Sequence, residues 1–217
     1  MTKHFLRELE NLKRDVTAMG GMAEAAVANA TRAFLQHDGE LARSVIEGDD
    51  EVNALELRIE EECLKLMALY APTARDLRFV VAVFKITNDL ERMGDLAANI
   101  AERAKSVVSD GTGPITSELR EMSDRVRGMV RQSLDAFVAL DSASAKQVLA
   151  ADDRVDQMLR DAYEEQSHAV DEGQADFKGA LRVLSFAKYL ERVADHATNI
   201  AEDVVYLANG EVVKHQY

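Results

Sequence analysis

Apolar residues recur along most of the chain at spacings of three and four positions, the period of an α-helix with one buried face. The pattern is clearest in an apolar stripe formed by Val83, Ile86, Leu90, Met93, Ala97, Ile100, Ala104 and Val107. It is interrupted where turn residues gather, most densely at 109–116. The pattern therefore predicts six long helices, at residues 4–37, 39–70, 73–108, 116–140, 142–171 and 175–208.

The second half of the chain repeats the first. The segment LERMGDLAANIAE at 90–102 returns as LERVADHATNIAE at 190–202, and residues 33–52 similarly match residues 136–155. Self-similarity over such a length indicates a duplicated structural unit. We therefore predict an all-α fold of two tandem three-helix bundles with antiparallel helices. The predicted domains are copy one at 1–108, a linker at 109–116 and copy two at 117–217.

Gly48, followed by two aspartates, resembles the end of one helix and the start of another. The matching positions of copy two are Ala150 and Ala151, which continue a helix without difficulty. We therefore predict one continuous helix across this region in both copies, with Gly48 as a weak point.

Composition and charge narrow the possible partners. The chain carries 39 acidic and 26 basic residues, a formal net charge of −13. This charge opposes contact with nucleic acid phosphates and with anionic membranes. The longest apolar run, FVVAVF at 79–84, is far shorter than the roughly 20 residues needed to span a bilayer. A single cysteine and a charged start without an apolar leader favour a cytoplasmic protein.

Each copy places acidic and amide side chains one helical turn apart on two neighbouring helices. Like charges at this spacing repel one another, whereas a hard divalent cation accepts oxygen ligands from Asp, Glu and Asn. We expect Glu91, Asp95 and Asn99 to face away from the apolar stripe of their helix, and Asp49 and Asn53 to sit beside the stripe of theirs. A solvated acidic face is the competing interpretation. His196 could add a nitrogen ligand, but Leu96 occupies the matching place, so we expect a packing role. The candidate metal ligands are Asp49, Asn53, Glu91, Asp95 and Asn99 in copy one, and Asp152, Asp156, Glu191, Asp195 and Asn199 in copy two.

The whole chain resembles the PhoU family. The resemblance rests on DLRFVVAVFKITNDLERMGDLAANIAERA, on LRVLSFAKYLERVADHATNIAEDVVYL, and on the DDEVN and PTARDLR segments. It implies two three-helix bundles, usually dimeric, that negatively regulate phosphate uptake and the phosphate-starvation response. The implied partners are a sensor histidine kinase (PhoR-like) and the ATPase of the phosphate-specific ABC transporter (PstB-like). The resemblance also implies metal clusters on the Glu/Asp-x-x-x-Asp motifs, holding Mg, Mn, Zn or Fe. Asn53 departs from the motif, since copy two has Asp156 there.

Two other functional classes are compatible with the residues, namely a carboxylate-bridged metal-dependent enzyme and a metal-free structural helical adaptor. An active site should break the duplication, because one copy would gain an acid, a base or a nucleophile. The motifs match closely in the two copies, so we expect a binding protein and no enzyme. The segments 79–84 and 181–186 are apolar on nearly every face. We expect them to be covered in a homodimer, or by the other copy within one chain.

Overall fold

The computed structural model describes residues 3–210, and within them the chain forms six α-helices. They are α1 (Lys3–Gln36), α2 (Gly39–Tyr70), α3 (Ala74–Asp110), α4 (Ser117–Ala139), α5 (Ser142–Asp171) and α6 (Phe177–Asn209). This confirms the predicted all-α class, and each helix end lies within two residues of its prediction. The outer bounds of the two predicted domains, residues 1 and 217, lie outside the described residues.

Local capping explains where several helices begin. Asp38 accepts a hydrogen bond from the Leu41 backbone N–H at 3.0 Å, and Asp141 accepts one from Ala143 at 2.9 Å. Such side chains satisfy backbone donors that a helix start leaves without partners. The two caps occupy matching places in the repeats. Helix α2 runs without a break through Gly48, as the comparison of the two copies predicted.

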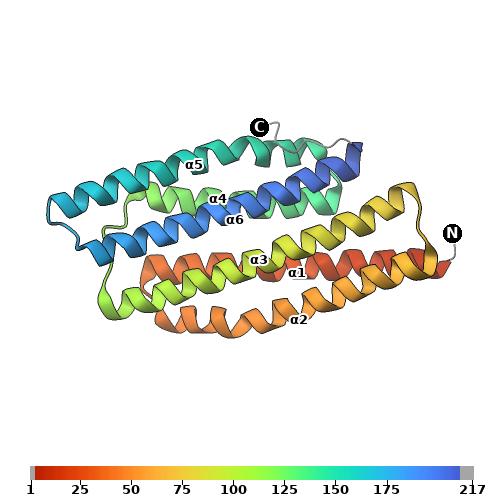
Figure 1. Ribbon diagram of the computed structural model, residues 1–217, viewed down its shortest axis with the longest axis horizontal. Helices are drawn as coiled ribbons and strands as arrows, with labels where there is room; N and C mark the ends of the chain where they lie inside the picture. Colours follow the sequence, from red (N-terminus) through yellow and green to blue (C-terminus); the bar gives the residue numbers. More distant parts are fainter. Residues whose placement is uncertain (1–2, 211–217) are drawn as a thin grey trace.

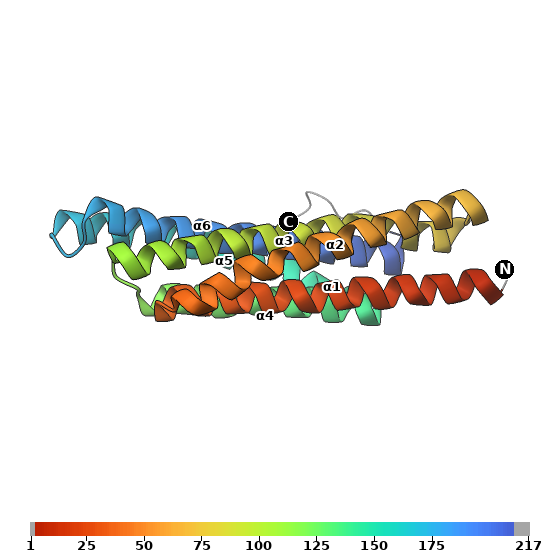
Figure 2. The ribbon, with the colours of Figure 1, turned by 90° about the horizontal axis from the view of Figure 1, so that it is seen from below.

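The helices are arranged in two layers (Figures 1 and 2). One layer contains four helices side by side in the order α5, α6, α3, α2, and the other contains α4 and α1. Helices α1, α2 and α3 pack together as one bundle, and α4, α5 and α6 form the second. The bundles meet where α3 lies against α6 and α1 lies against α4.

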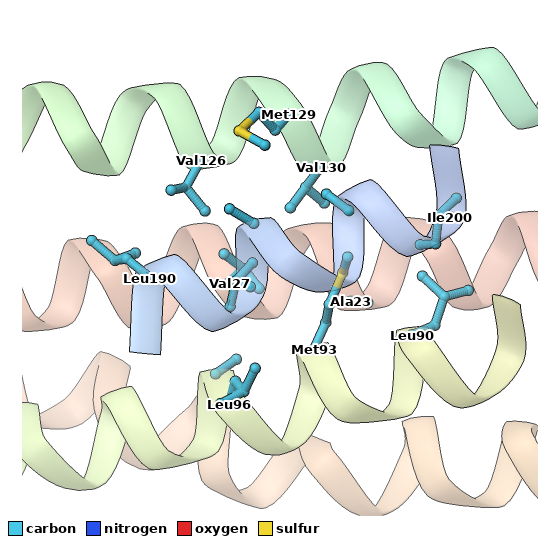
Figure 3. Packing of buried hydrophobic residues seen from close by; sticks show 14 of the residues in the cluster. Ala23, Val27, Leu90, Met93, Leu96, Val126, Met129, Val130, Leu190 and Ile200 are labelled. Carbon is cyan, nitrogen blue, oxygen red and sulfur yellow. The ribbon is translucent and has the colours of Figure 1, made fainter. Parts of the chain in front are cut away.

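One continuous hydrophobic core links the two bundles. Figure 3 shows Ala23 and Val27 of α1, Met93 of α3, and side chains of α4 and α6 gathered in the same interior. All of these residues belong to a single buried cluster. The repeats are therefore structural copies that share their interior.

The other repeat covers most of the two strongly apolar segments. Phe186 is fully buried and stacks on Phe34 with ring centroids 4.0 Å apart, while Phe79 stacks on Phe137 at 6.3 Å. Val81 and Leu181 remain partly exposed. Burial within one chain was one of the two predicted explanations, so these segments no longer provide a reason to expect a dimer.

The linker between the repeats is held against α6 and α5. Arg182 donates to the Asp110 carboxylate at 2.9 Å and to the Gly111 carbonyl at 3.1 Å. The buried Gln166 side chain donates to the Pro114 carbonyl at 3.0 Å. These contacts fix the linker to the second repeat rather than leaving it as a free tether.

Candidate functional site

The candidate ligands of copy one lie on α2 and α3, where these two helices pack together. The Asn53 side-chain amide donates a hydrogen bond from Nδ2 to Asp49 Oδ2, one turn earlier in α2, at 3.2 Å. On α3, the Arg92 side chain lies 3.2 Å from Asp95 Oδ2 and 3.4 Å from Glu91 Oε2. Arg92 therefore supplies part of the positive charge that this acidic group requires.

Gly94 allows the two helices to approach closely at this point. A Cβ atom at Gly94 would lie 3.1 Å from Asp49 Oδ1 and 3.4 Å from a methyl group of Val52. A hydrogen in place of the methyl group therefore lets the Asp49 carboxylate rest against α3. Copy two has Ala194 at this position, so the close approach is a feature of copy one.

The carboxyl groups of copy one interact across the two helices. Burial raises the pKa of Asp49 above its ordinary value, the Asn53 hydrogen bond opposes this, and the charges of Asp95 and Asp50 add to it. Burial also raises the pKa of Glu91, and the charge of Asp95 reinforces the effect. The packing of α2 on α3 thus brings Asp49 close enough to Glu91 and Asp95 for their charges to interact.

Copy two repeats this arrangement with a stronger effect. The pKa of Asp152 is raised to about 6, mainly by burial and further by the charges of Asp195 and Asp156. The pKa of Asp195 is likewise raised, first by burial and then by Glu191. Lys188 donates to Glu191 Oε1 at 2.6 Å, in place of the arginine contact of copy one. Copy two has Asp156 in place of Asn53, so it carries one more negative charge.

The burial of the two glutamates differs from the expectation that this face points away from the core. The Glu91 and Glu191 side chains are only 16% and 13% exposed. In each, the Oε2 atom is buried and makes no hydrogen bond, and the same is true of Asn53 Oδ1. Helical periodicity placed these residues opposite the apolar stripe, but the neighbouring helix covers them. Buried oxygen acceptors that make no hydrogen bond are suited to a cation.

The donor set fits a hard divalent cation, although the side chains do not already converge on one point. Among residues 3–210, no three His, Cys, Asp or Glu side chains stand close enough together to hold a metal ion. Carboxylate and amide oxygens, two buried acceptors without hydrogen bonds at equivalent places and raised carboxyl pKa values all favour a bound positive charge. Side-chain rotation at the α2–α3 and α5–α6 contacts would be needed to complete either site.

The two predicted asparagine ligands have different surroundings. Asn99 donates to the Asp95 backbone carbonyl at 2.8 Å, within its own helix. Asn199 instead donates to Asp89 Oδ1 at 3.1 Å, across the boundary between the repeats. As it stands, the Asn199 amide group joins the two bundles and is turned toward the other repeat.

Asn199 belongs to a polar cluster between α3 and α6 that the sequence did not reveal. Asp89 is buried and lies 2.8 Å from His196 Nδ1, while Lys85 donates to the buried Asp203 at 2.9 Å. A pocket of about 310 Å³ lies beside this cluster. It is lined by Phe84, Lys85, Asn88 and Asp89 of α3 and by Asn199 and Asp203 of α6. The sequence did contain one signal for this cluster, because its residues differ in chemistry from their counterparts in the other copy. Asp89 and His196 correspond to Tyr189 and Leu96. Lys85 and Asp203 correspond to Ser185 and Arg103.

None of the helices within residues 3–210 is both long and apolar enough to cross a membrane. Fold and site together define a class of protein: a duplicated six-helix bundle that carries a half-buried acidic group in each repeat. The PhoU domain model matches residues 16–104 and 119–204, which is most of both repeats. The chain belongs to the PhoU family.

Relatives and solved structures agree with this assignment. The chain is 40% identical over 211 residues to a phosphate-specific transport system accessory protein PhoU homolog of Aquifex aeolicus, covering 97% of this chain and 96% of the relative. It is 38% identical over 216 residues to the homolog of the same name from Pseudomonas putida, covering 99% and 84%. The crystal structure of PhoU from Pseudomonas aeruginosa superposes with a TM-score of 0.92 at 37% identity, covering 95% of this chain and 100% of that one.

The phosphate transport system regulatory protein PhoU from Streptococcus pneumoniae superposes with a TM-score of 0.89 at 30% identity, covering 97% of this chain and 99% of that one. Two structures from distant bacteria therefore share the architecture described above. Both confirm the two three-helix bundles.

Proposed function

We propose that this chain is a cytoplasmic regulatory adaptor that negatively controls a phosphate-specific ABC transporter and the phosphate-starvation two-component response. It would do so by binding the sensor histidine kinase (PhoR-like) and the transporter ATPase (PstB-like). The observation that carries the proposal is near full-length similarity to proteins named phosphate-specific transport system accessory protein. The proposal assigns no catalytic residue, since the carboxylate motifs match closely in the two copies and favour a binding protein.

The adaptor proposal is tested with purified components and in cells. The chain should bind the cytoplasmic region of the kinase and the ATPase in calorimetric titrations. Deleting its gene should leave a phosphate-starvation reporter active when phosphate is ample. Normal repression of the reporter in the deletion strain, together with no binding to either protein, would refute the proposal.

We further propose that the acidic groups of the two repeats each bind a divalent or iron-type cation, Mg, Mn, Zn or Fe. Asp49, Asn53, Glu91 and Asp95 would hold it in copy one, with the four matching residues in copy two. The buried Oε2 atoms of Glu91 and Glu191, which make no hydrogen bond, support this. A bound cation would supply positive charge that offsets carboxylate repulsion and thus join neighbouring helices.

The metal proposal predicts a rise in melting temperature on adding metal to chelator-treated protein. A ligand at a hundredfold excess over its Kd stabilises the folded state by about 2.7 kcal/mol. Asp95→Asn and Asp195→Asn should each remove part of this gain, while in metal-free protein both should be neutral or slightly stabilising because a like-charge repulsion is relieved. Asp135→Asn on the exposed surface of α4 is the charge-matched control. An identical metal response in wild type and the Asp95/Asp195 double variant would show that these residues are not ligands.

We also propose that the adaptor is a homodimer. The support is a pair of exposed leucines on one face of α2, Leu57 and Leu64, which lie two turns apart. Light scattering should give twice the mass of one chain. Leu57→Glu with Leu64→Glu should give the single-chain mass, whereas a monomeric wild type would refute the dimer.

A further inference from the structure

The end of the second repeat carries an apolar pocket that the core does not require. It lies between α5 and α6 next to the turn that joins them, at the extreme of the long axis in Figure 1. Its volume is about 240 Å³. Its main apolar lining is Tyr163, Val170, Phe177, Leu181 and Leu184.

Large apolar side chains at this pocket are unusually accessible. Phe177 is 72% exposed, Leu181 51% and Tyr163 50%. Contiguous apolar surface of this kind on a protein rich in charge marks a place where another molecule binds. Aromatic residues are also among those that contribute most to binding at protein interfaces. Phe177 and Tyr163 therefore have the character of anchoring residues.

Asp171 lines the pocket, and two further acidic residues are adjacent in sequence to residues that line it. Glu164 lies beside Tyr163 on α5, and Asp171 and Glu172 lie at the end of α5. Among residues 3–210 none of these three carboxylates forms an ion pair, and Lys178 is the basic residue that follows Phe177. At the equivalent end of the first repeat, Lys65 pairs with both Glu61 and Glu62 at 3.0 and 2.9 Å. The rim of the second repeat thus retains negative charge that internal lysines do not neutralise.

The apolar lining also differs between the repeats. Leu77 and Val81 stand where copy two has Phe177 and Leu181, and both are less exposed. Glu60 stands where copy two has Tyr163. The aromatic, acid-rimmed pocket is therefore a property of the second repeat alone, and Leu77 provides a matched internal control.

We propose that this pocket is the docking site for an amphipathic helix of a partner protein, with apolar anchors on one face and basic residues on both flanks. An apolar pocket between two packed helices can take anchoring side chains from the apolar face of a third helix, which presents them at positions i, i+3, i+4 and i+7. The acidic rim pairs with the basic flanks, and the net charge of −13 accelerates encounter with such a segment. The same charge disfavours an anionic lipid surface as the occupant. Identifying the natural partner as the kinase or the ATPase rests on the proposed adaptor function, whereas the binding chemistry does not.

The test uses the full chain and a synthetic amphipathic helical peptide as the probe. The peptide carries leucines at i, i+3, i+4 and i+7 and lysines on both flanks, and fluorescence anisotropy gives its Kd. Phe177→Ala should weaken binding about tenfold or more, as removal of an anchoring aromatic commonly does. Leu77→Ala should leave the Kd unchanged. Both side chains lie at the surface, and circular dichroism melting verifies that each variant is folded.

Charge is tested separately from apolar contact. The Asp171→Asn and Glu172→Gln double variant should weaken peptide binding severalfold and reduce its dependence on salt. The control is the Asp124→Asn and Asp135→Asn double variant, which removes the same number of charges from α4. It should have no such effect. A peptide with glutamates in place of the lysines should not bind to the wild-type chain.

Three results would overturn the proposal. The first is no binding of the lysine peptide to wild type, and the second is an equal loss in Phe177→Ala and Leu77→Ala. The third is binding of the chain to vesicles of zwitterionic or anionic lipid that depends on Phe177 while the peptide fails to bind, which would identify a membrane contact. Neither the kinase nor the ATPase is present in these measurements, so a failure of the adaptor proposal would leave their outcome unaffected.

Discussion

Glu91 and Glu191 occupy equivalent positions in the two repeats, and each buries one carboxylate oxygen without a hydrogen bond. Each also forms an ion pair with a basic residue of its own helix, Glu91 with Arg92 and Glu191 with Lys188. Burial is the main reason that the pKa values of Glu91 and of Asp152 lie above their ordinary values. A residue on the edge of a helix contact can therefore be acidic and still be withdrawn from water.

The raised pKa of Asp152 predicts how stability depends on pH. Because its pKa is about 6 in the folded chain and 3.8 ordinarily, the folded state binds this proton more tightly than the unfolded state. The resulting stabilisation is fully present below pH 3.8 and is lost as pH rises through about 6. Asp152→Asn should therefore lose less stability than wild type over this range, measured as urea midpoints at a series of pH values without metal. Asp153→Asn, an exposed neighbour with the same charge change, should behave as wild type does, and parallel profiles for wild type and Asp152→Asn would contradict the prediction.

At the scale of whole elements, the two copies of the long second helix can be compared directly. Helix α2 contains Gly48 in its interior, while α5 has Ala151 at the matching place. A Cβ atom at Gly48 would meet nothing within 4 Å. The helix continues because its packed face outweighs the poor helix propensity of one glycine.

Exchanging these two residues should change stability in opposite directions. Gly48→Ala should raise the free energy of unfolding by about 0.5–1 kcal/mol, because alanine loses less conformational freedom in a helix. Ala151→Gly should lower it by a similar amount. Urea denaturation measures both changes, and a destabilised Gly48→Ala variant would show that this glycine is needed for something other than helix formation.

The contact between α3 and α6 combines apolar packing with the Asp89 cluster. Asp89→Ala leaves His196 and Asn199 without their shared acceptor and should destabilise the fold by about 1–3 kcal/mol. Adding His196→Leu reproduces the apolar Leu96 of the other side and should recover part of the loss, because fewer polar groups remain unpaired. A urea double-mutant cycle measures this coupling. Strictly additive effects would mean that Asp89 and His196 do not stabilise the fold as a pair.

The helices and the repeat could be read from the sequence because both are local signals. Apolar spacing marks one face of each helix, and caps such as Asp38 and Asp141 mark helix starts. The partly buried state of Glu91 and the pairing of Asp89 with His196 could not be read in this way. They depend on which helices become neighbours in space, and Asp89 and His196 are 107 positions apart in sequence. The motif thus located the acidic groups, while packing determined their environment.

For the whole molecule, the shared core predicts one cooperative unfolding transition. Side chains of α1, α3, α4 and α6 meet in the same interior, so unfolding either repeat would expose a large apolar surface of the other (Figure 3). Hydrogen exchange at increasing urea should therefore show α2 and α5 losing protection together. Loss of protection in one repeat at clearly lower urea would show that the repeats are independent units.

The single Asp89–His196 pair also has a consequence for the history of such a fold. In an assembly of two identical half-length chains related by a twofold axis, every contact between a residue of one chain and a residue of the other occurs twice. The present chain has a hydrogen-bonded Asp89–His196 pair on one side of the α3–α6 contact and Tyr189 with Leu96 at the corresponding places on the other. Two identical chains cannot hold this inequality, whereas in one duplicated chain a mutation alters one half without altering the other. Joining the halves therefore freed each to specialise while the contact between them was preserved.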